Sequence, residues 1–288
     1  MIVKGNLVDC TEKGTIRIRE KNCIVIEEGI ISKIYSENEL PDSLKNEEIE
    51  DYGDSLIIPG LIDMHLHAPQ FAFRGLGMDM ELLDWLNTYT FPEEAKYKDI
   101  EYAKKAYKKF VDALVKSYST RAIVFATLHT QATILLMDML EESGLKCFVG
   151  KVNMDRNSTD ELIETTESSI DSTNKWLEVC ESRYQNTKPV ITPRFIPSCS
   201  DKLMKELGKI RGENYGLQSH LSENPKEIEW VKELCPDATG YLDAYDKRGS
   251  LNKSKVPTVM AHCVYSDEKE MELLKERDVY VAHCPQSN

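Results

Sequence analysis

The chain has 288 residues, of which 41% are hydrophobic, and a formal net charge of −13. This length predicts one large domain, alone or with a smaller companion. The acidity argues against a surface that binds nucleic acid or an anionic membrane.

The amino terminus lacks the apolar core of a signal peptide, and no apolar run approaches the roughly 20 residues of a membrane span. Eight cysteines are scattered without a Cys-x-x-Cys pair or a spacing typical of a disulfide framework. They indicate reduced, mostly buried thiols. We therefore expect a soluble cytoplasmic protein.

Residues 1–55 have the pattern of short strands. Apolar and β-branched runs recur at residues 2–3, 15–19, 23–26 and 30–35. Glu28-Gly29 between the last two runs predicts a hairpin turn, and residues 36–51 are polar and acidic, which indicates a surface connection. We expect residues 1–55 to form part of a small β-sheet or sandwich domain.

From residue 56 onward the pattern changes to strand, loop and helix, repeated. Strands are predicted at residues 56–63, 122–128, 146–152, 190–194, 217–220, 258–262 and 279–283. Helices are predicted at residues 101–116, 133–140, 159–180 and 225–234, and from an N-cap at Ser266-Asp267 to Arg277 with Glu270 completing a capping box. This alternation is typical of an α/β barrel or a doubly wound sheet.

The positions of the six histidines favour the barrel. His65 and His67 lie two residues apart after the run that begins at Leu56, and alternate residues of a strand point to the same face. Two imidazoles aimed at one point form half of a metal site. The other four histidines, which each follow a strand-like run, are His129, His220, His262 and His283.

Histidines at the carboxyl ends of successive strands are typical of a barrel active site. Any one of these histidines can instead be an unrelated core or surface residue. It is improbable, however, that all of them follow strand-like runs by chance. We therefore expect a TIM-type (β/α)₈ barrel over residues 56–288. A complete barrel has eight strands in about 250 residues. Only seven strands are predicted, so we expect the eighth to be missing and the small domain to be incomplete.

Two further segments carry side chains suited to catalysis or binding. Glu223, just beyond the strand that ends in His220, suits a proton shuttle beside metal-activated water; alternatively it is an acid favoured by the helix dipole before Pro225. Arg194 can hydrogen-bond a carbonyl or anion, and Phe195 offers a face for a planar ring.

Residues 59–70, Pro-Gly-Leu-Ile-Asp-Met-His-Leu-His-Ala-Pro-Gln, resemble the first motif of the amidohydrolase superfamily. More narrowly, the chain resembles the guanine deaminase branch of that superfamily. The segments that carry this resemblance are residues 83–94, 125–129, 149–155, 192–200, 218–224, 245–247, 260–263 and 282–288.

The resemblance implies hydrolytic deamination of guanine to xanthine and ammonia, in purine catabolism, by a homodimer. It also implies one metal ion per chain, Zn²⁺ or alternatively Fe²⁺. The implied metal ligands are His65, His67, His220 and His262. The implied catalytic residues are Glu223, as proton shuttle, and His262. The residues expected to contact the substrate are Gln70, Trp85, Arg194, Phe195, His220 and His283, whereas His129 is expected to line the pocket or to support it.

Two departures leave alternatives open. In the family an aspartate at the end of strand eight ligates the metal and orients the attacking water, and no such strand is predicted here. The strands that complete the small domain are absent as well. The chain is therefore expected to be a guanine deaminase that is active with the rest of its barrel, a deaminase or hydrolase of another amino-heterocycle such as a pterin, triazine or other aminopurine, or an inactive truncated chain.

Overall fold

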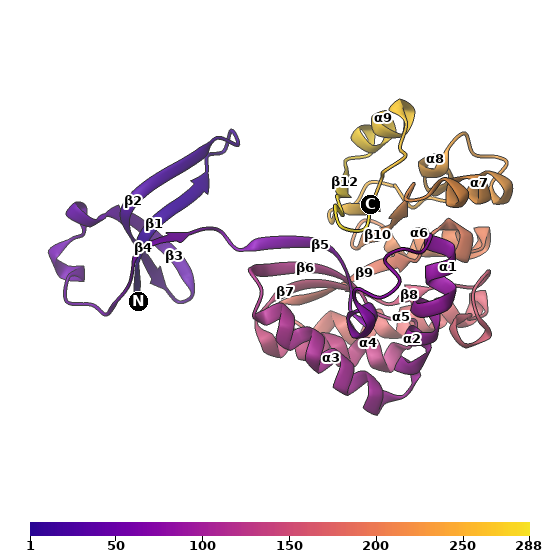
Figure 1. The fold of residues 1–288 in the computed structure, drawn as a ribbon, viewed down its shortest axis with the longest axis horizontal. Helices are drawn as coiled ribbons and strands as arrows, with labels where there is room; N and C mark the ends of the chain where they lie inside the picture. Colours follow the sequence, from indigo (N-terminus) through magenta and orange to yellow (C-terminus); the bar gives the residue numbers. More distant parts are fainter. The chain divides into compact units, whose positions relative to one another are not determined.

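The computed structural model describes residues 1–288 as two units, Met1–Leu61 and Ile62–Asn288. A four-stranded sheet forms the first unit. Its strands are β1 (Ile2–Cys10), β2 (Ile16–Glu27), β3 (Ile30–Ser36) and β4 (Ile49–Ile57). They lie in the order β3-β2-β1-β4 (Figure 1), with β1 parallel to β4 and the other pairs antiparallel.

Local sequence explains the hairpin of this sheet. Glu28 and Gly29 form a two-residue turn with φ of 50° and 77°, the left-handed conformation that such tight hairpin turns require at both positions. The predicted turn is therefore confirmed. Ile2, Cys23 and Val25 are buried together on one face of the sheet.

Two boundaries in this unit differ from the prediction. Residues 15–19 and 23–26 belong to one strand, β2, because a bulge absorbs the polar residues between them. Lys21 has a φ of 51° there, and its N–H bonds the Asn6 side chain instead of the ladder. The polar connection is also shorter than predicted. It holds two turns of 3₁₀ helix, Glu37–Glu39 and Asp42–Leu44, and ends where β4 pairs with β1.

The second unit contains the predicted barrel strands. They are β5 (Leu61–His67), β6 (Ser119–Phe125), β7 (Lys146–Gly150), β9 (Thr187–Pro193), β10 (Gly216–Leu221), β11 (Thr258–His262) and β12 (Val279–Ala282). Neighbours in the sheet are neighbours in sequence, and every pair from β6 to β12 is parallel. The short β8 (Val152–Asn153) pairs with β9. This confirms the TIM-type fold with seven strands, open between β5 and β12.

Helices alternate with these strands. They are α1 (Leu82–Trp85), α2 (Phe91–Ala95), α3 (Ile100–Val115), α4 (Thr130–Ser143), α5 (Thr166–Arg183), α6 (Asp201–Arg211), α7 (Pro225–Leu234), α8 (Tyr241–Asp246) and α9 (Glu268–Glu276). Shorter helical turns are η3 (Pro69–Phe73), η4 (Leu86–Thr90), η5 (Lys96–Lys98), η6 (Asp160–Leu162) and η7 (Ile196–Ser198). None of the helices is long and apolar enough to cross a membrane.

Helix ends follow the capping residues. Gly144 ends α4 at a φ of 78°, and Asp267 caps α9 by accepting from the Glu270 N–H. Glu270 does not complete the predicted capping box, because its carboxylate bonds Ser222 and the Leu242 N–H. The predicted helix 159–180 begins later, at Thr166, since the Thr165 side chain caps it there.

The predicted strand 56–63 is in fact two strands. β4 ends at Ile57 and β5 begins at Leu61, because Pro59 has no N–H to give to a ladder. His65 and His67 therefore lie within the carboxyl-terminal half of β5 rather than beyond a strand end.

The core of the second unit lies between its sheet and its helices. In Figure 1, α3 and α4 lie side by side, α3 against β6 and α4 against β7. α4 contributes Leu136 and Met137, both without solvent exposure, and α5 contributes the equally buried Trp176.

Replacing Leu136 by Ala is expected to lower the free energy of unfolding by about 2–5 kcal/mol, because it leaves a cavity in this core. Val115→Ala, at a side chain that is half exposed, serves as the control and is expected to change stability by less than about 0.5 kcal/mol. Urea unfolding of both variants is the measurement. Equal effects would contradict the placement of α4.

Candidate active site

A cavity of about 210 Å³ opens at the carboxyl ends of the barrel strands. It lies where a barrel of this kind is expected to hold its active site. Every predicted site residue except His129 and His283 lines it: His65, His67, Gln70, Trp85, Arg194, Phe195, His220, Glu223 and His262. The structure thus brings together side chains from β5, β10, β11 and the segments that follow β9 and β10.

Four imidazoles meet in this cavity. His65, His220 and His262 each place one ring nitrogen within 4.8 Å of a ring nitrogen of the other two. His67 Nε2 lies 3.0 Å from His220 Nε2. Two nitrogens bound tetrahedrally to one zinc ion at about 2.0–2.1 Å are separated by about 3.3 Å, so this close approach fits two ligands of a shared ion.

Hydrogen bonds at the far side of two rings fix their orientation. His220 Nδ1 lies 2.7 Å from the carbonyl oxygen of Arg194; since a carbonyl oxygen only accepts, Nδ1 carries the proton. His262 Nδ1 bonds Asn288 Oδ1 at 2.9 Å. A ring that donates through Nδ1 has a free lone pair on Nε2. His220 Nε2 faces His67 in the cluster, and His262 Nε2 lies beside Glu223.

Burial keeps the histidines in the form that a metal binds. It lowers the pKa of His65 to about 3, and it also lowers the pKa of His67 and His220 well below the ordinary value. Imidazole ligates only when it is deprotonated. The donor set, neutral and pointed inward, therefore fits a transition-metal ion such as zinc or iron.

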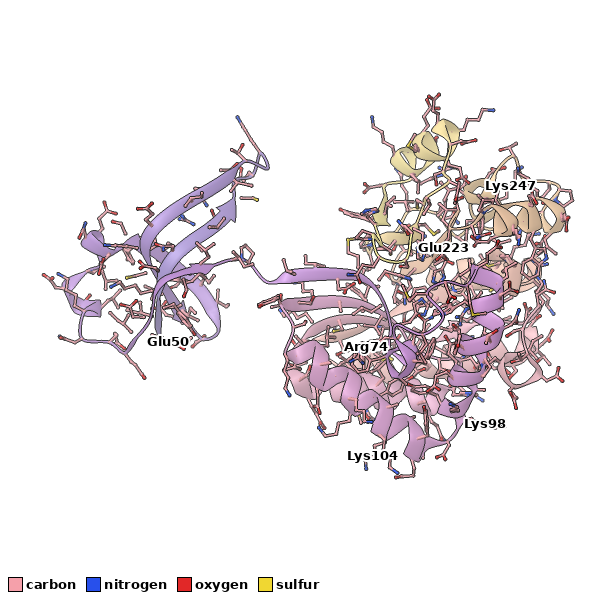
Figure 2. All side chains as sticks on the ribbon, viewed as in Figure 1. Glu50, Arg74, Lys98, Lys104, Glu223 and Lys247 are labelled. Atoms are coloured by element: carbon pink, nitrogen blue, oxygen red, sulfur yellow. The ribbon has the colours of Figure 1, made fainter.

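Glu223 stands beside this cluster, with Oε2 at 3.4 Å from His262 Nε2. Burial, with a smaller contribution from the neighbouring Glu227, raises its pKa to about 8, although Arg194 opposes the shift. Figure 2 shows Glu223 inside the unit, whereas the labelled Lys104 and Lys247 project from its surface. Asn224 caps α7 and Glu223 directly precedes it, so the helix-dipole alternative for Glu223 stays open beside the proton shuttle.

The loops that present these groups have strained backbone. Ser222 has a φ of 50°, His262 of 75° and Cys263 of 54°. Such left-handed conformations of residues other than glycine cost about 1–3 kcal/mol each and gather at functional sites. The Cys263 N–H bonds the Leu221 carbonyl oxygen at 2.8 Å, which ties the ends of β10 and β11 together.

Two glutamates at the site were not predicted. Glu227 lines the cavity, and its Oε2 accepts the backbone N–H of Glu223 at 3.1 Å. Glu94 Oε2 lies 2.6 Å from Arg194 Nη1, and both side chains are buried. Their sequence signal is weak, because a glutamate in a helix is usually solvated.

The helical segment 82–98 supplies one wall of the cavity, through Leu82, Trp85 and Leu86. It is not a regular α-helix: the Phe91 N–H bonds the Leu86 carbonyl oxygen, five residues back. Pro92 lacks the N–H that an α-helix needs at that point. This π turn, a feature common at functional sites, joins the wall residues to Glu94.

Two predicted residues lie elsewhere. His283 is exposed and does not line the cavity, so its substrate contact stays a prediction. His129 begins α4, where its carbonyl oxygen accepts from the Thr133 N–H. Its half-buried ring lies outside the cavity lining.

A parallel-stranded barrel with histidines and a carboxylate at its mouth is typical of metal-dependent hydrolases. The amidohydrolase family matches residues 56–288, and the chain belongs to this family.

Several proteins to which the chain is similar are guanine deaminases. That of Dictyostelium discoideum is 38% identical over all of this chain and 67% of its own length. The human one is 44% identical over 80% of this chain and 51% of its own. The crystal structure of guanine deaminase from C. acetobutylicum, with guanine bound in the active site, is 44% identical, covers 99% of this chain and 67% of its own, and superposes with a TM-score of 0.94. The chain thus spans about half to two thirds of the length of these relatives.

Replacing His220 by Ala is expected to weaken Zn²⁺ binding by more than the roughly 10–100-fold typical of a residue that only supports a ligand. His129→Ala is the matched control, since His129 also follows a barrel strand but lies outside the cluster. Competition with a zinc-binding dye measures both affinities. Equal Zn²⁺ affinity of the two variants would contradict the ligand assignment.

Proposed function

We propose that this site deaminates guanine, hydrolysing its exocyclic C–N bond to release xanthine and ammonia. The observation that carries the proposal is the meeting of four neutral histidines and Glu223 in a cavity shared with Arg194. The guanine deaminases that resemble the chain, one of them with guanine bound, support this substrate over other amino-heterocycles.

The proposal includes one Zn²⁺ per chain, held by His65, His67, His220 and His262, with Fe²⁺ as the alternative. When bound, such an ion lowers the pKa of water toward neutrality and so supplies a nucleophile. The part of His220 and His262 is to present Nε2, held by the bonds from Nδ1.

Glu223 is the proposed proton carrier. Its carboxyl group lies beside His262 Nε2 and faces the cavity, so it can take a proton from the attacking water. It then returns that proton to a purine ring nitrogen. When the second proton of the water, carried by the new hydroxyl group, passes to the amino group, the C–N bond breaks, ammonia leaves and the carbonyl of xanthine forms. Guanine and water are thereby converted to xanthine and ammonia.

Other residues hold the purine. Arg194 and Gln70 offer N–H donors to the carbonyl and ring nitrogens of the base. Phe195 and Trp85 bring aromatic faces to the same cavity, where a planar ring can stack. The predicted homodimer and cytoplasmic location stay predictions.

The complete gene product loaded with Zn²⁺ is expected to convert guanine to xanthine, measured by ultraviolet absorbance, in preference to a panel of pterins, triazines and other aminopurines. Glu223→Gln is expected to reduce kcat by about 10²–10⁴-fold, the usual contribution of a positioned acid–base group, with the Zn²⁺ content unchanged. A zinc-loaded enzyme without turnover of guanine would contradict the proposal.

A further inference from the structure

The backbone of Arg194 is fixed from two sides. Its carbonyl oxygen accepts from His220 Nδ1 at 2.7 Å and from Ser219 Oγ at 3.1 Å, and its N–H bonds the Asn153 carbonyl oxygen at 3.3 Å. These bonds fix the position of the Arg194 backbone, and hence the point from which its side chain extends, beside the histidine cluster. Only the side chain is left to be oriented.

Glu94 orients that side chain. Its Oε2 lies 2.6 Å from Arg194 Nη1, and the two side chains are only 1% and 3% exposed. The guanidinium carbon also lies 5.1 Å from the centre of the Phe91 ring. Nη1 is thereby engaged by α2, whereas Nε and Nη2 have no protein partner, and Arg194 lines the cavity.

The pair has a consequence for charge. A buried ion pair is weak evidence for a role in stability, because apolar side chains of similar volume often serve as well. Breaking it, however, leaves one charge uncompensated in a low-dielectric site. With Glu94 in place, the guanidinium offers donors to a base while its positive charge is cancelled. Guanine is uncharged near neutral pH, whereas xanthine is a stronger acid and is partly an anion there.

We propose that Glu94 is a positioning and specificity residue: it holds Arg194 for the neutral purine and, by cancelling its charge, prevents tight binding of the anionic product. This inference rests on the proposed guanine deaminase function. Glu94 acts through Arg194 and does not line the cavity itself. Its other oxygen, Oε1, is buried without a protein partner, so the carboxylate has no second protein contact that accounts for its burial.

The test compares Glu94→Gln, which keeps the shape and loses the charge, with the unaltered complete gene product at pH 8. The ratio of the inhibition constant of xanthine to the KM of guanine is expected to fall about tenfold, because an unpaired buried guanidinium favours an anionic partner. kcat is expected to change by less than about threefold, since the reacting atoms are untouched. A ratio within twofold of the unaltered protein, in a folded variant with full Zn²⁺ content, overturns the proposal.

Glu94→Asp separates orientation from charge. It keeps the negative charge but shortens the reach to Arg194, so the KM of guanine is expected to rise about tenfold, as for a weakened buried charge-assisted hydrogen bond. The xanthine-to-guanine ratio is expected to stay within about twofold because the charge is retained. An unchanged KM overturns the positioning role even if Glu94→Gln does not fold.

Glu93→Gln is the matched control. Glu93 lies next to Glu94 on α2 and is also buried, but it pairs with Lys96 and bonds Tyr102 rather than Arg194. Its ratio of the xanthine inhibition constant to the guanine KM is expected to equal that of the unaltered protein, and an equal shift in both variants overturns the proposal. If the unaltered protein does not turn over guanine, the proposed function fails by itself. Equilibrium binding of guanine and xanthine to the same variants then tests Glu94 separately.

Discussion

The parallel alignment of the strands is the constraint on which the site depends. Because β10 and β11 run in the same direction and in register, with His220 opposite Ala261 and Leu221 opposite His262, their carboxyl ends deliver both imidazoles to one edge of the sheet. β5 delivers His65 and His67 to the same edge from far away in the sequence. No local element brings these groups together.

Arg194 connects the two halves of the site. Its backbone carbonyl oxygen orients His220 in the histidine cluster, while its side chain faces the cavity from an ion pair with Glu94. A shift at the end of β9 would therefore disturb both the proposed metal ligand, His220, and the proposed substrate contact, Arg194. The backbone of Ser222 and His262 is left-handed, a conformation that costs free energy. It is tolerated because the surrounding contacts hold it in place.

Much of the fold was predictable because its signals are local. The 3.6-residue period defined α3, the glycine after α4 marked its end, and β-branched runs marked the strands. The errors occurred where side-chain contacts override the pattern: the bulge at Lys21 joins two predicted strands, and the Thr165 cap delays α5. Pro59 divides the strand before the histidines, a boundary that its missing N–H explains.

By itself the sequence determined the chemistry of the site: which imidazoles end which strands, that Glu223 follows one of them, and to which family these motifs belong. Only the tertiary structure decided that Glu94 pairs with Arg194, that Glu227 holds the Glu223 backbone, and that His283 lies outside the cavity. The reason is physical. A strand pattern records the direction of a side chain relative to its own backbone, whereas the burial and pairing of a charge depend on residues that folding brings from elsewhere in the chain.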